Sequence, residues 1–251
     1  MERQERLNRI KQWQQTEEYA LQYTTFLSAA HRLISLAEQT MPEIETLAEK
    51  IYGQTVRTVA AKQSWLHRGY YCPSRVYDLV VGNVKRGTLL KRLTARSKSY
   101  FLYGFDEKDR LLWSKHFYNN CHIKSEYLLH MGSSIYGFTI DLRGHLEAIT
   151  EEVYENNRLV CYRYLLVVSR ESAIEPVEMK QENYTYDSEG LLYCDWYRLH
   201  PAIFLLTHER VTFARKDGYL TQYWVDRIVG STHQEVVEKS DIYDVLVERK
   251  A

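Results

Sequence analysis

The chain has 251 residues, of which 45% are hydrophobic, so it can bury a core as one large domain or two small ones, and wholesale disorder is not expected. Its 33 basic and 33 acidic residues give a formal net charge of zero, which disfavours nucleic acid or an anionic membrane as the main partner. The 21 tyrosines and five tryptophans are typical of an antiparallel sheet, where cross-strand aromatic pairs stabilise the ladder.

The first 68 residues are predicted to form a helical hairpin. Apolar side chains recur with a period close to 3.6 over residues 3–39, without proline or glycine, which predicts one long amphipathic helix. Residues 40–43, Thr-Met-Pro-Glu, have the pattern of a capping box and predict the start of a second helix. Its apolar stripe runs over residues 44–66. Because the connection is so short, the two helices are expected to lie antiparallel.

From residue 69 onward the pattern predicts strands, because apolar residues recur with a period of two. Consecutive strands with short links and no intervening helix imply an antiparallel meander of hairpins. The expected fold is therefore α+β, with a helical hairpin over 1–68 packed as one unit with a sheet domain over 69–251. Residues 171–181, which contain Pro176, are expected to form a loop. The expected strands are 76–81, 88–90, 100–105, 111–113, 125–130, 135–140, 145–154, 158–168, 182–187, 191–198, 202–206, 210–215, 219–226, 234–239 and 242–248.

An aromatic-turn unit recurs along this part of the chain. Its copies begin at residues 103, 136 and 184, and a degenerate fourth copy begins at 213. Alternating aromatic residues suit a half-buried strand, and the aspartate followed by glycine or a second aspartate suits a tight turn. The unequal spacing of the copies favours one curved sheet over a β-helix with uniform rungs.

The third copy, residues 184–191, reads Tyr-Thr-Tyr-Asp-Ser-Glu-Gly-Leu and resembles the YxYDxxGxL unit of the tyrosine-aspartate repeats in Rhs-type toxin shells. The first copy has Asp109 where the glycine belongs, and the second has Thr139 where the aspartate belongs. Such strips also resemble the β-hairpins of small bacterial immunity proteins of polymorphic toxin systems. The resemblance implies hairpin geometry and, as a function, the neutralisation of a cognate toxin.

The chain contains none of the common catalytic motifs, such as GxSxG, a Gly-rich phosphate loop or HExxH. We therefore predict no catalytic residue and no cofactor. The adjacent acids Glu151 and Glu152 would point to opposite faces of a strand, so they cannot act together and are expected to be edge charges. Cys72, next to Pro73, is expected to mark the junction between helix and sheet rather than a nucleophile.

The cysteines and histidines do not have the spacing of a zinc site, so no metal is expected. Only Cys121 and His122 are close together, and they are adjacent rather than two to four residues apart. The four cysteines are far apart and are expected to be reduced and buried. The charged start of the chain shows no secretory signal, and no apolar run approaches about 20 residues, which predicts a soluble cytoplasmic protein without a membrane partner.

The strands around residues 191–197 and 219–224 are expected to display a tyrosine-rich face with interspersed acids, while the opposite, apolar face packs beneath the helices. Tyrosine combines contact area with a hydroxyl group and few rotatable bonds, so this face is the predicted surface for a protein partner. The predicted partner-binding residues are Tyr184, Tyr186, Asp187, Glu189, Tyr193, Asp195, Tyr197, Tyr219 and Tyr223.

The sequence therefore favours a non-catalytic binding protein, and within that class an immunity protein or antitoxin. One alternative is a small-molecule-binding or carbohydrate-binding, or hydrolysing, protein with an aromatic pocket in the sheet. A second alternative is a structural or assembly component. A strip of basic residues over 85–98 is interpreted as a solvated sheet edge, with a phosphate-binding strip as the other interpretation. The oligomeric state and the identity of the partner do not follow from the sequence.

Overall fold

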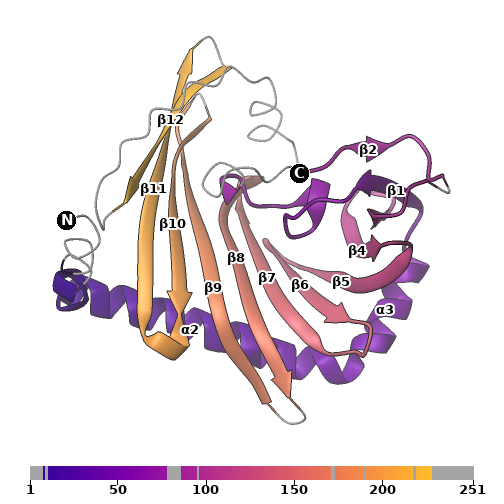
Figure 1. Cartoon of the computed structure of the whole chain (residues 1–251), viewed down its shortest axis with the longest axis horizontal. Coiled ribbons are helices and arrows are strands. Elements are labelled where there is room, and N and C mark those ends of the chain that lie inside the picture. Colours follow the sequence, from indigo (N-terminus) through magenta and orange to yellow (C-terminus); the bar gives the residue numbers. More distant parts are fainter. Residues whose placement is uncertain are drawn as a thin grey trace.

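The computed structural model describes residues 8, 11–77, 86–94, 96–170, 173–188, 190–216 and 219–227. Within them a single 12-stranded antiparallel sheet has the order β12-β11-β10-β9-β8-β7-β6-β5-β4-β3-β1-β2. The predicted antiparallel meander is confirmed, because β3 to β12 neighbour one another in chain order (Figure 1). The strands are β1 (Arg57–Lys62), β2 (Leu89–Leu90), β3 (Tyr100–Phe105), β4 (Leu111–Tyr118), β5 (Cys121–Met131), β6 (Ser134–Asp141), β7 (Leu146–Glu155), β8 (Arg158–Arg170), β9 (Ala173–Tyr186), β10 (Leu191–His200), β11 (Leu205–Lys216) and β12 (Tyr219–Arg227).

The predicted long N-terminal helix is interrupted, because residues 11–14 are helical and a turn at residues 15 and 16 separates them from the next helix. Helix α2 spans Glu17–Thr40, and the Thr16 hydroxyl caps it by accepting a hydrogen bond from the Tyr19 amide at 3.1 Å. Threonine is a favoured N-cap because its side chain satisfies an amide that has no partner inside the helix. The periodicity continues through this cap, so the pattern alone did not reveal the break. Residues 1–7 and 9–10 lie outside the described part of the chain.

The capping box predicted at residues 40–43 does not form. Thr40 keeps a helical backbone, and its hydroxyl donates a hydrogen bond to the Leu36 carbonyl at 2.8 Å. A short 3-10 turn, Met41–Glu43, joins α2 to helix α3 (Ile44–Gly53). The helical pattern expected as far as residue 66 therefore ends at Gly53.

Residues expected to be helical form strand β1 instead. β1 pairs with β3 over its whole length and with β2 at two positions. Val59 fits a helical stripe with Leu66, but β-branched residues such as Val56, Thr58 and Val59 also favour strands. The long-range pairing with β3 decides the outcome. The sheet thus includes residues that precede position 69, where the predicted sheet domain begins.

The expected loop at residues 171–181 is also corrected, because Ala173–Tyr186 form strand β9. β9 pairs with β8 on one side and β10 on the other. Pro176 is accommodated where the pairing with β8 shifts at Leu166 and Val167, since a bulge does not need the amide hydrogen that proline lacks. Tyr77 is not in a strand, and the expected strands at 234–239 and 242–248, like residues 78–81, lie outside the described residues.

An aspartate side chain caps the turn of three aromatic-turn units, and the first two of these turns share one geometry. In the first two, the Oδ1 atoms of Asp106 and Asp141 each accept hydrogen bonds from two backbone amides of the turn, at 2.8–2.9 Å. In the third, Asp187 Oδ1 accepts one from the Gly190 amide at 2.9 Å. The aspartate of the second unit is therefore Asp141, and Thr139 occupies a strand position. These turns close the β3–β4, β6–β7 and β9–β10 hairpins.

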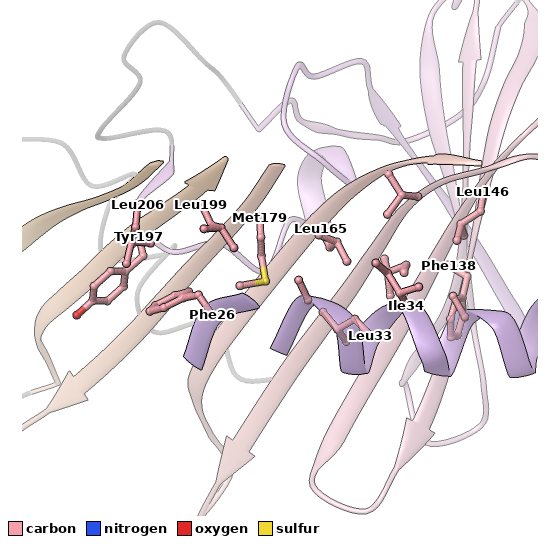
Figure 2. Packing of buried hydrophobic residues seen from close by; sticks show 14 of the residues in the cluster. Phe26, Leu33, Ile34, Phe138, Leu146, Leu165, Met179, Tyr197, Leu199 and Leu206 are labelled. Carbon is pink, nitrogen blue, oxygen red and sulfur yellow. The ribbon is translucent and has the colours of Figure 1, made fainter. Parts of the chain in front are cut away.

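Helix α2 runs across the strands and covers one face of the sheet (Figure 1). Paired positions on six neighbouring strands, β6 to β11, place one apolar residue from each strand in a continuous row. Figure 2 shows Phe26, Leu33 and Ile34 of α2 packed on this row. Residues at spacings of three, four and seven lie on one helix face, which is why this stripe meets the sheet. The row comprises Phe138, Ile149, Leu165, Met179, Leu199 and Leu206.

Among the described residues, none of the helices combines the length and the apolar character needed to cross a membrane.

Candidate functional site

The face of the sheet opposite α2 is covered by the segment 63–77, which is anchored at Arg68. Arg68 is buried and has a left-handed backbone (φ 58°), followed by Gly69, also left-handed (φ 54°). The Tyr103 hydroxyl donates a hydrogen bond to the Arg68 carbonyl at 2.9 Å and accepts one from the Tyr70 amide at 3.0 Å. A Cβ on Gly69 would lie 2.7 Å from the Tyr103 hydroxyl oxygen, so glycine is required here. This tight turn directs the Arg68 side chain into the interior.

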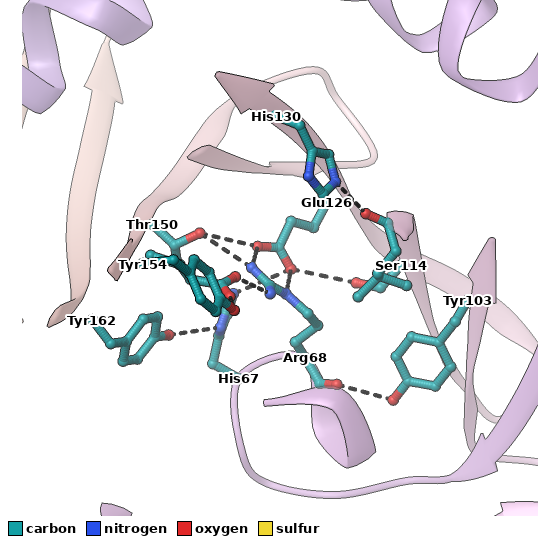
Figure 3. A network of polar contacts seen from close by, with 11 residues as sticks. His67, Arg68, Tyr103, Ser114, Glu126, His130, Thr150, Tyr154 and Tyr162 are labelled. Carbon is teal, nitrogen blue, oxygen red and sulfur yellow. Dashed lines mark hydrogen bonds and ion pairs between the residues drawn. The ribbon is translucent and has the colours of Figure 1, made fainter. Parts of the chain in front are cut away.

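The Arg68 guanidinium lies between two buried carboxylates, Glu126 and Glu152. Figure 3 shows Arg68 and Glu126 facing each other. Its Nε and Nη2 atoms donate to the two oxygens of Glu126 on β5 at 3.0 and 2.7 Å, and Nη1 donates to Glu152 on β7 at 2.6 Å. Two parallel bonds to one carboxylate fix both the distance and the orientation of the side chains. Gly137 on β6 leaves the necessary room, because a Cβ there would lie 2.3 Å from Glu126 Oε1. The network thus joins β5, β7 and the segment 63–77.

The electrostatics of this network are those of a structural ion pair. Burial by itself would raise the pKa of Glu126, but the attraction of Arg68 and His67 outweighs burial and holds that pKa below its usual range. Burial also lowers the pKa of His67, whose Nδ1 atom lies 3.0 Å from the Tyr162 hydroxyl. A carboxylate that stays ionised in this way cannot act as a general acid near neutral pH.

His116 is expected to lower the free energy of unfolding as the pH falls below that of ordinary histidine titration. Its ring is buried and stacks on Phe101 at 4.2 Å, and burial lowers its pKa to about 4. As the pH falls, the unfolded chain protonates this histidine at an ordinary pKa of about 6.5, before the folded chain does. The contribution of His116 to the free energy of unfolding is therefore fully present above that pH and is lost as the pH falls toward 4. We expect His116→Phe, which keeps a flat ring on Phe101, to make the free energy of unfolding fall less steeply between pH 6.5 and 4.

Urea unfolding of the wild type and His116→Phe at several pH values measures this slope. Burial raises the pKa of Glu182, which acts in the opposite sense, but Glu182 is common to both proteins and cancels in the comparison. Equal slopes in the two proteins would contradict the assignment.

A third buried carboxylate, Glu182 on β9, holds the next part of the same segment. It accepts hydrogen bonds from the Ser74 hydroxyl, the Arg75 amide at 3.1 Å and the Tyr184 hydroxyl. The Arg86 guanidinium donates to the carbonyl of Cys72 at 2.6 Å and to that of Ser74. The segment is therefore fastened to the sheet at two places, Arg68 and Ser74.

The paired acids of β7 point to opposite faces, as predicted, but they are not edge charges. Glu151 and Glu152 are both buried in a strand that has neighbours on both sides. Glu151 faces α2 and accepts hydrogen bonds from Arg32 at 2.6 Å and from Arg163 at 2.5 Å. Arg32 and Arg68 come from distant parts of the chain and Arg163 from the neighbouring strand β8, so the residues next to these acids in sequence could not reveal that both charges are paired.

The cysteines and histidines form no site within the described residues. Cys72, Cys161 and Cys194 are buried, but Cys121 is exposed, which corrects the expectation of four buried thiols. Cys121 begins β5 directly after a two-residue turn, where its side chain meets solvent. No group of three or more histidine, cysteine or acidic residues in the described ranges could hold a metal ion.

The predicted partner-binding residues do not form one surface. Tyr184 is buried, and its hydroxyl binds Glu182 on the face covered by the segment 63–77. Tyr197 is buried on the other face, where its ring lies 4.7 Å from that of Phe26. The tyrosine-bearing face of β10 is therefore the one that α2 covers at Tyr197, contrary to the expectation that the helices would take the opposite face.

Of the remaining predicted residues, Tyr186, Tyr193, Asp195 and Tyr223 are half-buried, whereas Asp187 is exposed. Tyr193 and Asp195 share a face, and Arg210 lies over the Tyr193 ring at 4.3 Å and binds Asp195 at 2.8 Å. Tyr186 donates its hydroxyl hydrogen to the Leu159 carbonyl at 2.7 Å. Their role in partner binding stays a prediction. Asp187 belongs to its turn, Tyr223 is half-buried against the core, Tyr219 begins β12, and Glu189 lies outside the described residues.

Sequence reasoning missed the most exposed large apolar side chain of the described residues, Trp65, which is 80% exposed. Its neighbours Ser64 and Leu66 are 5% and 2% exposed, and the Leu66 amide donates to the Ser64 hydroxyl at 3.1 Å. Three residues further on, Arg68 fixes the segment. Trp65 thus stands on a rigid support and points into solvent. No local signal marks it, because the surrounding pattern predicted a helix.

The polar space beneath this segment is small. A cavity of about 10 Å³ lies among residues that include His67, Arg68, His116 and Glu126. Such a volume holds about one water molecule. A shallow open hollow lies elsewhere, between the β7–β8 turn and the end of β9, and is lined by residues that include Asn156 and Tyr186.

Comparison with protein-family models finds no match, and comparison with curated proteins finds none either.

Proposed function

We propose that this protein is a non-catalytic protein-binding protein whose principal anchor is Trp65. The observation that carries the proposal is an 80% exposed tryptophan between two buried neighbours. Exposing an indole ring gains nothing in folding, since the hydrophobic effect favours its burial. The buried charged groups beneath the segment, Arg68, Glu126 and Glu152, are engaged with one another, and the cavity of about 10 Å³ beside them leaves no room for a substrate.

The support of Trp65 matches what an interface anchor requires. Tryptophan is enriched among the few residues that carry most of the binding energy of an interface. An anchor that is already held in place loses less conformational entropy on binding than a mobile one. The Ser64 turn and the Arg68 network supply that rigidity.

We propose further that the partner is a cognate toxin and that the protein acts as an immunity protein or antitoxin in the cytoplasm. The hairpins with aspartate-capped turns support this proposal through their resemblance to those of polymorphic toxin systems. The aspartate-to-glycine turn is present at residues 141–144 as well as 187–190, so two copies rather than one have this pattern.

Co-expression with the proteins encoded beside its gene tests the proposal. One of them should co-purify with this chain and lose its toxicity. Trp65→Ala should weaken that complex by about thirtyfold or more, which corresponds to about 2 kcal/mol for a central anchor. Leu142→Ala, at a residue that is 62% exposed in the β6–β7 turn, is the control and should leave affinity unchanged. Failure of every neighbouring product to bind, or equal affinity of the two variants, would refute it.

A further inference from the structure

Three stretches of chain converge at the end of β1, two to three residues before Trp65. The Lys62 amide donates to the Thr88 carbonyl at 2.9 Å, next to β2. The Gln63 amide donates to the Ser99 carbonyl at 3.3 Å, at the start of β3. Residues 62–65, 88–93 and 96–99 therefore form one continuous region at the β2 end of the sheet.

This region carries a concentration of positive charge. Its exposed cations form what we name the basic edge: Lys62, Lys91, Arg92, Arg96 and Lys98. None of them forms an ion pair with any residue in the described ranges. Over residues 57–100 the sequence contains a single acidic residue, Asp78, although the whole chain is neutral. Although the total charge is neutral, this region therefore has a strong positive local field.

Apolar side chains accompany these cations. Leu89 and Leu93 are 46% and 42% exposed, and Leu89 pairs with Ala61 at the end of β1. Together with Trp65 they give the region an apolar component, and the basic edge supplies charges near it. Protein interfaces combine an apolar, aromatic centre with a polar and charged rim in this way.

We infer that the basic edge and Trp65 bind an acidic segment of a partner protein, one in which glutamate or aspartate alternates with apolar residues. This inference rests on the proposed protein-binding function and names the chemistry of the partner. Complementary charges would speed association and exclude basic competitors, while the indole ring and the two leucines would supply burial.

The surface composition favours a protein over single-stranded nucleic acid. Nucleic-acid grooves combine cations with several aromatic rings on which successive bases stack. Here one exposed tryptophan is accompanied by two exposed leucines, which suit apolar side chains of a protein better than base faces.

Fluorescence anisotropy with two labelled probes tests the inference. One probe is a short peptide of glutamate interspersed with leucine and phenylalanine, and the other is a short single-stranded DNA. The peptide should bind, and added salt should weaken binding because it screens the exposed charges. Lys91→Glu/Arg92→Glu should weaken peptide binding by about tenfold or more, and so should Trp65→Ala. The matched control is Lys108→Glu/Arg143→Glu, which makes the same charge change in two exposed turns and should bind as the wild type does.

Tighter binding of the DNA than of the peptide, with the same dependence on Lys91 and Arg92, would assign the surface to nucleic acid and overturn the inference. Peptide binding that Lys91→Glu/Arg92→Glu leaves unchanged, or no binding of the peptide, would also overturn the inference. The proposed function is judged separately. A toxin complex that survives Lys91→Glu/Arg92→Glu unchanged would leave that function standing while removing this inference.

Discussion

Arg68→Met is expected to lower the free energy of unfolding by about 3–5 kcal/mol, because removing one partner of a buried ion pair leaves the other charge uncompensated. Two carboxylates depend on this guanidinium, Glu126 at 2.7 Å and Glu152 at 2.6 Å. Both would face a methionine side chain that offers no hydrogen-bond donor. Urea unfolding at pH 7, followed by circular dichroism, measures the loss.

The contrast with a surface pair makes this measurement specific. Arg57 pairs with Asp109 at side chains that are 44% and 74% exposed, so Arg57→Met should cost about 1 kcal/mol or less. Arg68→Lys keeps the charge but loses the forked geometry, and its stability should fall between those of the wild type and Arg68→Met. Equal losses for Arg57→Met and Arg68→Met would show that the buried network does not hold the segment 63–77.

Leu33→Ala should lower the free energy of unfolding by about 2–5 kcal/mol through the cavity that it leaves between helix and sheet. Leu33 is fully buried in the middle of α2, where it packs on the apolar row of β6 to β11 (Figure 2). Because α2 crosses several strands, one residue at its centre has little scope for local collapse. The same unfolding experiment measures the effect.

A leucine on the same helix provides the matched control. Leu21 is 71% exposed, so Leu21→Ala makes the same chemical change without opening a cavity and should change stability by no more than about 0.5 kcal/mol. Similar losses at positions 21 and 33 would mean that α2 does not pack on the sheet through this face.

Local sequence patterns predicted those helices and strands that short-range sequence determines. Alternating aromatics and aspartate-led turns predicted the hairpins of the meander, and the apolar period predicted the helix that the structure places at Glu17–Thr40. β1 was predicted as helix because short apolar runs fit both periods, and only its pairing with β3 selects the strand. Pro176 suggested a loop, but a bulge in the pairing with β8 admits it.

The candidate site was beyond such reasoning because it depends on contacts between distant residues. Arg68 meets Glu126 and Glu152 across 58 and 84 positions of sequence. The exposure of Trp65 follows from those same contacts, since they fix the segment on which it lies. Tyrosine alternation separated the two faces of β10 correctly from Tyr193 to Tyr197, but a bulge between Leu191 and Tyr193 moves Leu191 to the face of Cys194 and Trp196. The alternation could also not tell which face a helix would cover.

The adjacent carboxylates of β7 have a consequence for how the sheet is assembled. Glu151 binds Arg32 of helix α2 on one face, and Glu152 binds Arg68 of the segment 63–77 on the other. A slip of β7 by one residue against its neighbours would turn each carboxylate toward the wrong layer and would expel Ile149 from beneath α2. Both ion pairs and the apolar row would be lost at once. Two consecutive acids thereby restrict helix, sheet and covering segment to a single alignment.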